Sequence, residues 1–92
     1  MQIHEKIKAI RQAEGLTQVQ LSDFSGVPMS TISKLDAGIN SNMKAETLQK
    51  IAGLPQFEKY ALWLLTDKTD PANGQISPAI KAYAEKIRLD AG

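Results

Sequence analysis

Few residues in this chain have the chemistry for catalysis or metal binding. The sequence has no cysteine and a single histidine, His4, which excludes a cysteine zinc site and a histidine metal cluster. We expect His4 to be exposed near the chain terminus. Ser33 and Lys34 do not form a catalytic pair, because neighbouring residues on a helix point in different directions. No nucleophile, base and orienting group can be assembled from motif spacing, so we expect neither enzyme activity nor a cofactor.

A polar helix face in the first half of the chain can instead bind another molecule. The segment 29–36 has apolar residues at helical spacing only at Ile32 and Leu35, so it buries a narrow stripe. A short helix expected over 17–25 precedes it, and Gly26 permits a sharp turn between the two. Two short helices joined by a glycine turn are typical of the helix-turn-helix, whose second helix fits the ~12 Å wide major groove of DNA. The outward face of that second helix carries Met29, Ser30, Ser33 and Lys34.

Apolar periodicity and capping residues predict an all-α fold of five to six helices. Thr17 offers an N-cap oxygen, and Gln20 stands three residues later at capping-box spacing. Gln75-Ile76 is long enough only for a short strand. We divide the chain into a helix-turn-helix core at 1–53 and an extension at 54–92 that belongs to the same compact domain. The other helices are expected over 2–14, 44–52, 54–66 and 78–89.

The composition fits one soluble globular domain. The chain has 92 residues, of which 42% are hydrophobic and 23% charged. Eleven basic and ten acidic residues give a net charge of +1, which neither requires nor excludes a nucleic-acid partner. The N-terminus lacks the apolar core of a signal peptide, and no window approaches the ~20 apolar residues that span a bilayer. We therefore expect a cytoplasmic protein that does not enter a membrane.

Two sets of short motifs resemble a known family. The first set is Gly15-Leu16-Thr17-Gln18, Leu21-Ser22, Gly26-Val27 and Thr31-Ile32-Ser33-Lys34-Leu35-Asp36-Ala37-Gly38. With these motifs, residues 3–53 resemble the lambda-repressor-like (Xre) DNA-binding domains. The second set is Pro55-Gln56-Phe57, Lys59-Tyr60, Leu62-Trp63, Gly74-Gln75-Ile76 and Pro78-Ala79. This set resembles the region that follows the DNA-binding helices in the short immunity C repressors of Peduovirus-type temperate phages. The resemblance implies a homodimeric transcriptional repressor in a phage or prophage switch controlling lysogeny.

The resemblance also implies roles for individual residues. It places helix 29–36 in the major groove of a double-stranded DNA operator, and it makes Arg11 and Asp36 a pair that braces the first helix against the third. The base-contacting residues would be Met29, Ser30, Ser33 and Lys34. The backbone-contacting residues would be Gln18, Thr17, Thr31, Asn40, Ser41, Asn42 and Lys44.

The segment after the fourth helix would form the dimer interface. Trp63 lies off the main apolar stripe of its helix, and this second apolar face is more than one small domain readily covers. The expected interface residues are Phe57, Tyr60, Leu62, Trp63, Leu64, Ile76, Ile80 and Tyr83.

Two other functions remain open from the sequence. An antitoxin would use the same motif but hold a toxin against its C-terminal half, and a protein-binding adaptor would keep the fold without contacting DNA. We expect no self-cleaving domain, because 92 residues leave no room for one beside the helix-turn-helix core. We therefore expect relief of repression to come from another protein such as an antirepressor, from concentration, or from competition at the operator.

Overall fold

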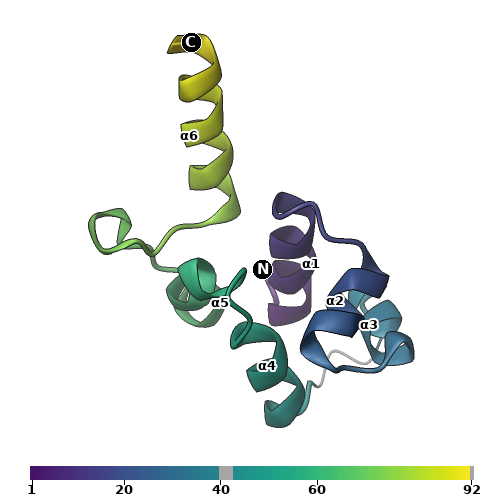
Figure 1. Ribbon diagram of the computed structural model, residues 1–92. Coiled ribbons are helices and arrows are strands. Elements are labelled where there is room, and N and C mark those ends of the chain that lie inside the picture. Colours follow the sequence, from purple (N-terminus) through teal and green to yellow (C-terminus); the bar gives the residue numbers. More distant parts are fainter. Residues whose placement is uncertain (40–42, 92) are drawn as a thin grey trace.

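The computed structural model describes residues 1–39 and 43–91. Its described part is all-helical, with six α-helices and no strand, which confirms the predicted fold class (Figure 1). The α-helices are α1 (Ile3–Ala13), α2 (Gln18–Ser25), α3 (Met29–Asp36), α4 (Ala45–Ala52), α5 (Ala61–Thr66) and α6 (Pro78–Ala91). Two 3₁₀ turns, η1 (Glu58–Tyr60) and η2 (Pro71–Asn73), lie on either side of α5.

Helix α2 begins where its capping residues predict. The Gln20 N–H donates to Thr17 Oγ1 at 3.0 Å, and the Thr17 N–H donates to Gln20 Oε1 at 2.9 Å. These reciprocal bonds satisfy two amide groups that a helix start leaves without intrahelical partners. The local sequence therefore fixes the beginning of the first helix of the motif.

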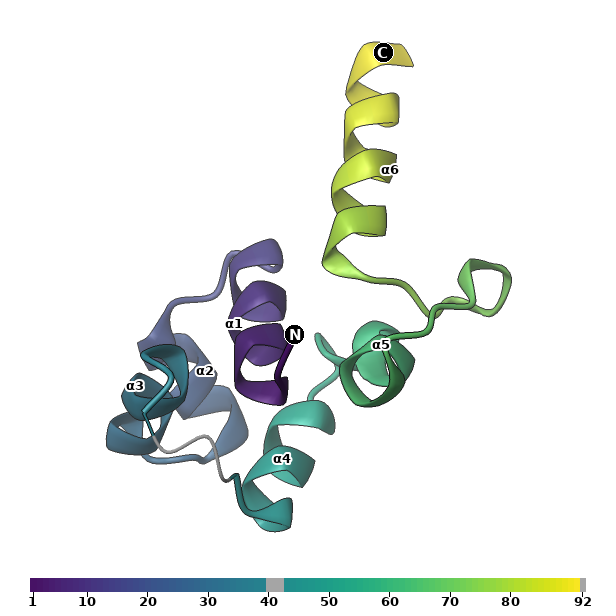
Figure 2. The same cartoon turned by 180° about the vertical axis from the view of Figure 1, so that it is seen from behind.

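A single hydrophobic core joins the two predicted segments. Helix α1 lies between the α2 and α3 pair on one side and α5 on the other, as opposite views show (Figures 1 and 2). Side chains from both 1–53 and 54–92 are buried together, so the two segments contribute to one core. The core residues are Ile7, Ile10, Leu21, Val27, Ile32, Leu35, Ile51, Phe57, Tyr60 and Leu64.

The chain between α4 and α5 departs from the predicted helix over 54–66. Phe57 N–H donates to Leu54 O at 2.8 Å and Tyr60 N–H donates to Phe57 O at 2.9 Å, which are bonds across three residues. Three residues per turn place Phe57 and Tyr60 on one side of the backbone, and both are completely buried. The predicted continuous helix was wrong, because the bonds before Ala61 span three residues and the α-helix begins only at Ala61.

The short strand expected at Gln75-Ile76 is also absent from the described residues. Gln75 makes one isolated antiparallel bridge with Asp70, and this bridge closes the small loop that contains η2. A pair of residues at the end of a tight loop has no neighbouring strand to extend along. The chain then reaches Ser77, the residue before α6.

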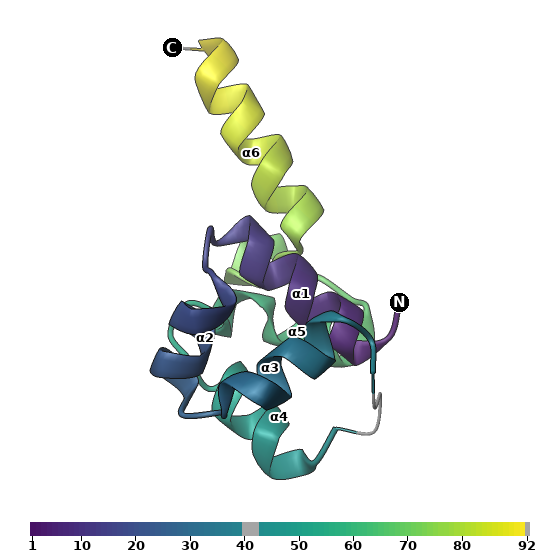
Figure 3. The same ribbon diagram turned by 90° about the vertical axis from the view of Figure 1, so that its right-hand side faces the viewer.

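Helix α6 leaves the body of the molecule and projects away from it (Figures 1 and 3). The molecule is therefore elongated, with extents of 41 × 24 × 21 Å. Among the described residues, α6 packs on the body at its base, where it lies against α1. None of the helices in residues 1–39 and 43–91 combines the length and the hydropathy required to cross a membrane.

Candidate nucleic-acid interface

The turn between α2 and α3 is held by backbone geometry and by one serine. Gly26 adopts a left-handed conformation with φ of 75°, which ends α2 and turns the chain sharply. The Ser22 hydroxyl donates to Val27 O at 2.6 Å across this turn. Because Val27 is buried beneath it, the turn has little freedom, and α3 is fixed relative to α2.

Helix α3 exposes the face that the sequence predicts. Ile32 and Leu35 are buried against the core, whereas Met29 is 38% exposed. Ser30 and Lys34 are also exposed, and α3 runs along the outside of the bundle (Figure 3). These three side chains are therefore free to meet a ligand that approaches this surface.

Ser33 and Gln18 are bonded to each other, which the sequence did not indicate. The Ser33 hydroxyl donates to Gln18 Oε1 at 3.1 Å, and Gln18 Nε2 donates to Asp36 Oδ2 at 3.0 Å. A glutamine amide has two N–H donors, so one of them remains available. Gln18 is thus held in one orientation at the start of α2 and still presents a donor.

Arg11 and Asp36 form the predicted pair between α1 and α3. Arg11 Nε donates to Asp36 Oδ1 and Arg11 Nη2 donates to Asp36 Oδ2, both at 3.0 Å. Arg11 Nη1 also donates to Leu16 O at 2.8 Å, so the guanidinium is bonded on two sides. Parallel bonds of this kind fix geometry more strictly than a single ion contact. The C-terminal end of α3 is therefore bonded to α1 through a side-chain network that includes Gln18.

Three of the remaining predicted backbone contacts lie at or near the starts of helices. Thr17 is exposed, although its hydroxyl oxygen already caps α2, and Thr31 is partly buried on α3. Lys44 is exposed at the residue that precedes α4. Asn40, Ser41 and Asn42 lie outside the described residues.

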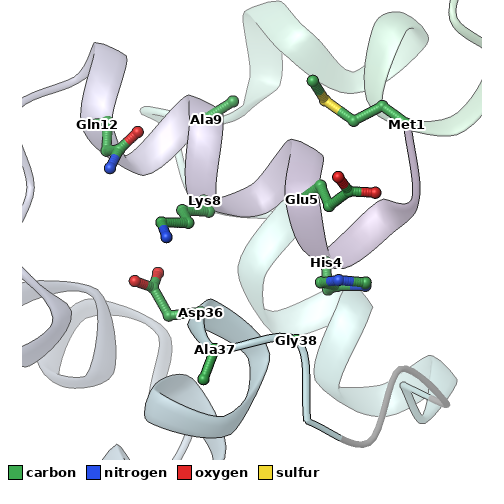
Figure 4. A pocket seen from close by; sticks show the side chains of 9 residues that line it. All are labelled: Met1, His4, Glu5, Lys8, Ala9, Gln12, Asp36, Ala37 and Gly38. Atoms are coloured by element: carbon green, nitrogen blue, oxygen red, sulfur yellow. The ribbon is translucent and has the colours of Figure 1, made fainter.

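A hollow of about 430 Å³ separates the outer side of α1 from the end of α3 (Figure 4). Lys8 and Asp36 face each other across it in Figure 4. His4 is partly buried here rather than exposed, and its Nδ1 atom has no hydrogen-bond partner among the described residues. The lining residues are Met1, His4, Glu5, Lys8, Ala9, Gln12, Asp36, Ala37 and Gly38.

The structure divides the expected dimer-interface residues into two groups. Phe57, Tyr60 and Leu64 are fully buried inside a single chain, so they have no surface to offer a partner. The Tyr60 hydroxyl donates to Glu14 Oε2 at 2.8 Å, and burial, helped by this carboxylate, raises the pKa of Tyr60 above its usual range. The residues that keep some exposure are Leu62, Trp63, Ile76, Ile80 and Tyr83.

Further apolar side chains, which we did not assign to the interface from the sequence, are exposed in the same region. Leu65 at the end of α5 is 58% exposed, and Ile87 and Leu89 stand out on α6. Ile87 continues the spacing of Ile80 and Tyr83 along α6, and this periodicity is the signal that identifies it. Periodicity alone does not reveal that α6 projects and leaves these side chains uncovered.

Comparisons with known proteins agree with this geometry. A family model described as Helix-turn-helix matches residues 7–57, which is more than half of the chain. Repressor protein C of Escherichia phage P2 is 39% identical over 83 residues, which cover 90% of this chain and 83% of that protein. The resemblance inferred from the sequence motifs is thereby confirmed. The chain belongs to the Xre-like helix-turn-helix family of DNA-binding domains.

Proposed function

We propose that this protein is a sequence-specific, DNA-binding transcriptional repressor of phage or prophage type, active in the cytoplasm as a homodimer. Each copy inserts α3 into the major groove of its operator. The observation that carries the proposal is the exposed face of α3, held outward by the Gly26 turn and braced by Arg11 and Asp36. The similarity to Repressor protein C of Escherichia phage P2 supports a repressor rather than an activator or an adaptor.

Four side chains read the bases. Lys34 donates to guanine O6 or N7, Ser30 bonds to either base type, and Met29 contacts a thymine methyl group. Ser33 has its hydroxyl hydrogen directed at Gln18, so it offers lone pairs and acts as an acceptor for a base amino group. None of these side chains is an arginine or a glutamine, which make bidentate base contacts. Discrimination per base is therefore at the low end of ~1 to 3 kcal/mol.

Backbone contacts position the reading helix. Gln18 uses its free N–H to bind a phosphate at the start of α2, where helix amides favour anions. Lys44 supplies the positive charge at the start of α4. The other positioning residues are Thr17, Thr31, Asn40, Ser41 and Asn42.

Dimerisation raises the affinity for the operator, which a single copy would bind weakly. A chain of net charge +1 makes few phosphate contacts, and joining two copies makes the second half-site binding effectively intramolecular. Tyr83 is 67% exposed on α6, and an apolar side chain so placed favours burial against a second copy. The interface residues proposed are Leu62, Trp63, Ile76, Ile80 and Tyr83, extended by Leu65, Ile87 and Leu89.

Footprinting on the DNA that adjoins the gene tests this function. Lys34→Ala and Ser33→Ala should each weaken protection by about fivefold, which corresponds to ~1 kcal/mol per contact. Lys68→Ala is the matched control, since Lys68 is an exposed lysine in the turn after α5, far along the chain from α3. Wild-type binding should also weaken steeply as salt is added, because bound phosphates release counterions.

Two results would contradict the proposal. If both α3 variants bind the operator as tightly as wild type at every salt concentration, α3 does not read the bases. Sedimentation that shows monomers at the concentrations where the operator is bound would remove the homodimer. Co-purification of a second polypeptide in place of the second copy would favour the antitoxin alternative.

A further inference from the structure

The base of α6 is attached to the body of the molecule by contacts of two kinds. The Ile76 N–H donates to Lys59 O at 2.8 Å, and the next residue, Ser77, is buried. The Ser77 hydroxyl oxygen accepts from the Ile80 N–H at 3.2 Å and so caps the start of α6 itself. One turn further along, Lys81 Nζ donates to Ala13 O at 3.0 Å. The first contacts fix a point on the chain, whereas the Lys81 contact fixes the direction in which α6 leaves that point.

Lys81 completes the C-terminus of α1. The N–H groups of Glu14, Leu16 and Gly15 donate to the carbonyls of Ile10, Arg11 and Gln12, at 2.9, 3.0 and 3.1 Å. Ala13 O is the next carbonyl of that last turn, and Lys81 supplies its donor. A helix C-terminus also carries partial negative charge, which attracts an ammonium group. The site on α1 therefore suits a cation from another helix.

Neighbouring acids hold the Lys81 ammonium in place. Glu85, one turn further along α6, accepts a hydrogen bond from Lys81 Nζ. Glu14 Oε2 lies 4.0 Å from the same nitrogen and belongs to the residue that follows α1. This bond from Lys81 also keeps the pKa of the Glu85 carboxyl below its ordinary value. The ammonium is thus bonded to both helices at once.

A small change in the direction of α6 has a large effect at its far end. At ~1.5 Å per residue, a helix of 14 residues is about 21 Å long, so a tilt of about 10° at its base moves its end by about 4 Å. One base-pair step is about 3.4 Å. Because α6 extends beyond its base in every view, no packing among the described residues of the same copy opposes such a tilt further along (Figures 1, 2 and 3).

We propose that Lys81 is a positioning residue that fixes α6 against α1 and thereby sets the spacing between the two α3 helices of the dimer. The coupling runs from Lys81 to Ala13 on α1, and from Arg11 on α1 to Asp36 on α3. This inference rests on the proposed function, since it requires that the face of α6 joins two copies. Lys81 contacts neither the DNA nor the second copy in this role.

Spin labels measure the spacing directly. The chain has no cysteine, so Asp23→Cys on exposed α2 introduces one label site in each copy. Pulsed dipolar spectroscopy on the dimer then reports the distance between the two α2 helices. The protein that carries Asp23→Cys alone should give a narrow distribution of label-to-label distances. Adding Lys81→Met, which keeps the length and apolar stem of the side chain but removes its cation, should widen that distribution at least twofold.

Matched variants separate positioning from folding. Lys86→Met changes an exposed lysine on α6 and should leave the distribution narrow, and Lys81→Arg, which restores a cation, should recover most of the wild-type width. Circular dichroism and melting temperature check that each variant is folded. If Lys81→Met does not fold, Lys81→Gln takes its place. As a second readout, selection from a duplex library with a randomised stretch should return one half-site spacing for wild type and several for Lys81→Met.

The outcomes distinguish this inference from the proposed function. A folded Lys81→Met variant with wild-type width and a single half-site spacing would overturn the inference and leave the repressor proposal intact. A broad distribution in the Asp23→Cys background would overturn it as well. Absence of dipolar coupling in that background, together with monomers in sedimentation, would overturn the homodimer itself and with it the role of Lys81.

Discussion

Replacement of Asp36 by alanine should destabilise the fold more than most surface changes. The Asp36 carboxylate accepts bonds from Arg11 Nε, Arg11 Nη2 and Gln18 Nε2, each at 3.0 Å. The exposed fractions of the Arg11 and Asp36 side chains are 13% and 12%. Asp36→Ala therefore leaves a nearly buried guanidinium without its anion.

The magnitude follows from the burial and from what remains bonded. Loss of one partner from a buried ion pair costs ~3 to 5 kcal/mol of unfolding free energy. Arg11 keeps its bond to Leu16 O, and some solvent reaches the site, so we expect the lower end, about 3 kcal/mol. At ~4 to 8 °C per kcal/mol for a domain of this size, the melting temperature should fall by about 12 to 24 °C.

Urea denaturation followed by circular dichroism measures the effect in a double-mutant cycle. Arg11→Met removes the positive charge that Asp36→Ala leaves unpaired. The loss of unfolding free energy in the double variant should therefore be smaller than the sum of the two single losses, by ~1 to 3 kcal/mol. A loss below about 1 kcal/mol for Asp36→Ala, or additive losses in the cycle, would refute the reasoning. Gln18 would lose its bond to Asp36 in the same variant, so weaker operator binding should accompany the lower stability.

Two further predictions concern backbone strain and pH. Gly26→Ala should cost about 1 to 2 kcal/mol from the φ of 75° alone, since an added Cβ meets no atom within 4 Å, and Gly26→Asn should cost less because asparagine tolerates this region. Equal urea midpoints for the two variants would contradict the strain argument. The Lys6 ammonium lies 2.6 Å from Asp67 Oδ1, and this hydrogen bond lowers the pKa of Asp67, so the stabilisation is present at neutral pH and lost as the pH falls below the ordinary value of 3.8. The stability difference between wild type and Asp67→Asn should therefore shrink in acid; a constant difference would disprove the linkage.

Much of the first half of the fold follows from local sequence. The capping box at Thr17 and Gln20 fixes the start of α2, and Gly26 fixes the turn that follows. The outward face of α3 follows from having only Ile32 and Leu35 at inward spacing. The resemblance added Arg11 and Asp36, which the structure joins as predicted.

The second half was harder to predict. The spacing of Phe57, Tyr60 and Leu64 shows that they share an apolar face, but does not show whether that face meets the same chain or another one. The structure places them in the core of the single chain. It leaves Tyr83 and Ile87 outside, because α6 departs from the body beyond its base.

Capping, turn and periodicity signals act between residues within about four positions of each other, so the sequence by itself determined α1 to α4 and α6, the glycine turn and the polar face of α3, but not the chain between α4 and α5. Only the tertiary structure decided the contacts between distant segments. Lys6 reaches Trp63 O across 57 positions, and Lys81 reaches Ala13 O across 68. These donors meet their acceptors only after folding has placed α5 and the base of α6 beside α1, because no local pattern encodes which carbonyl a lysine will find.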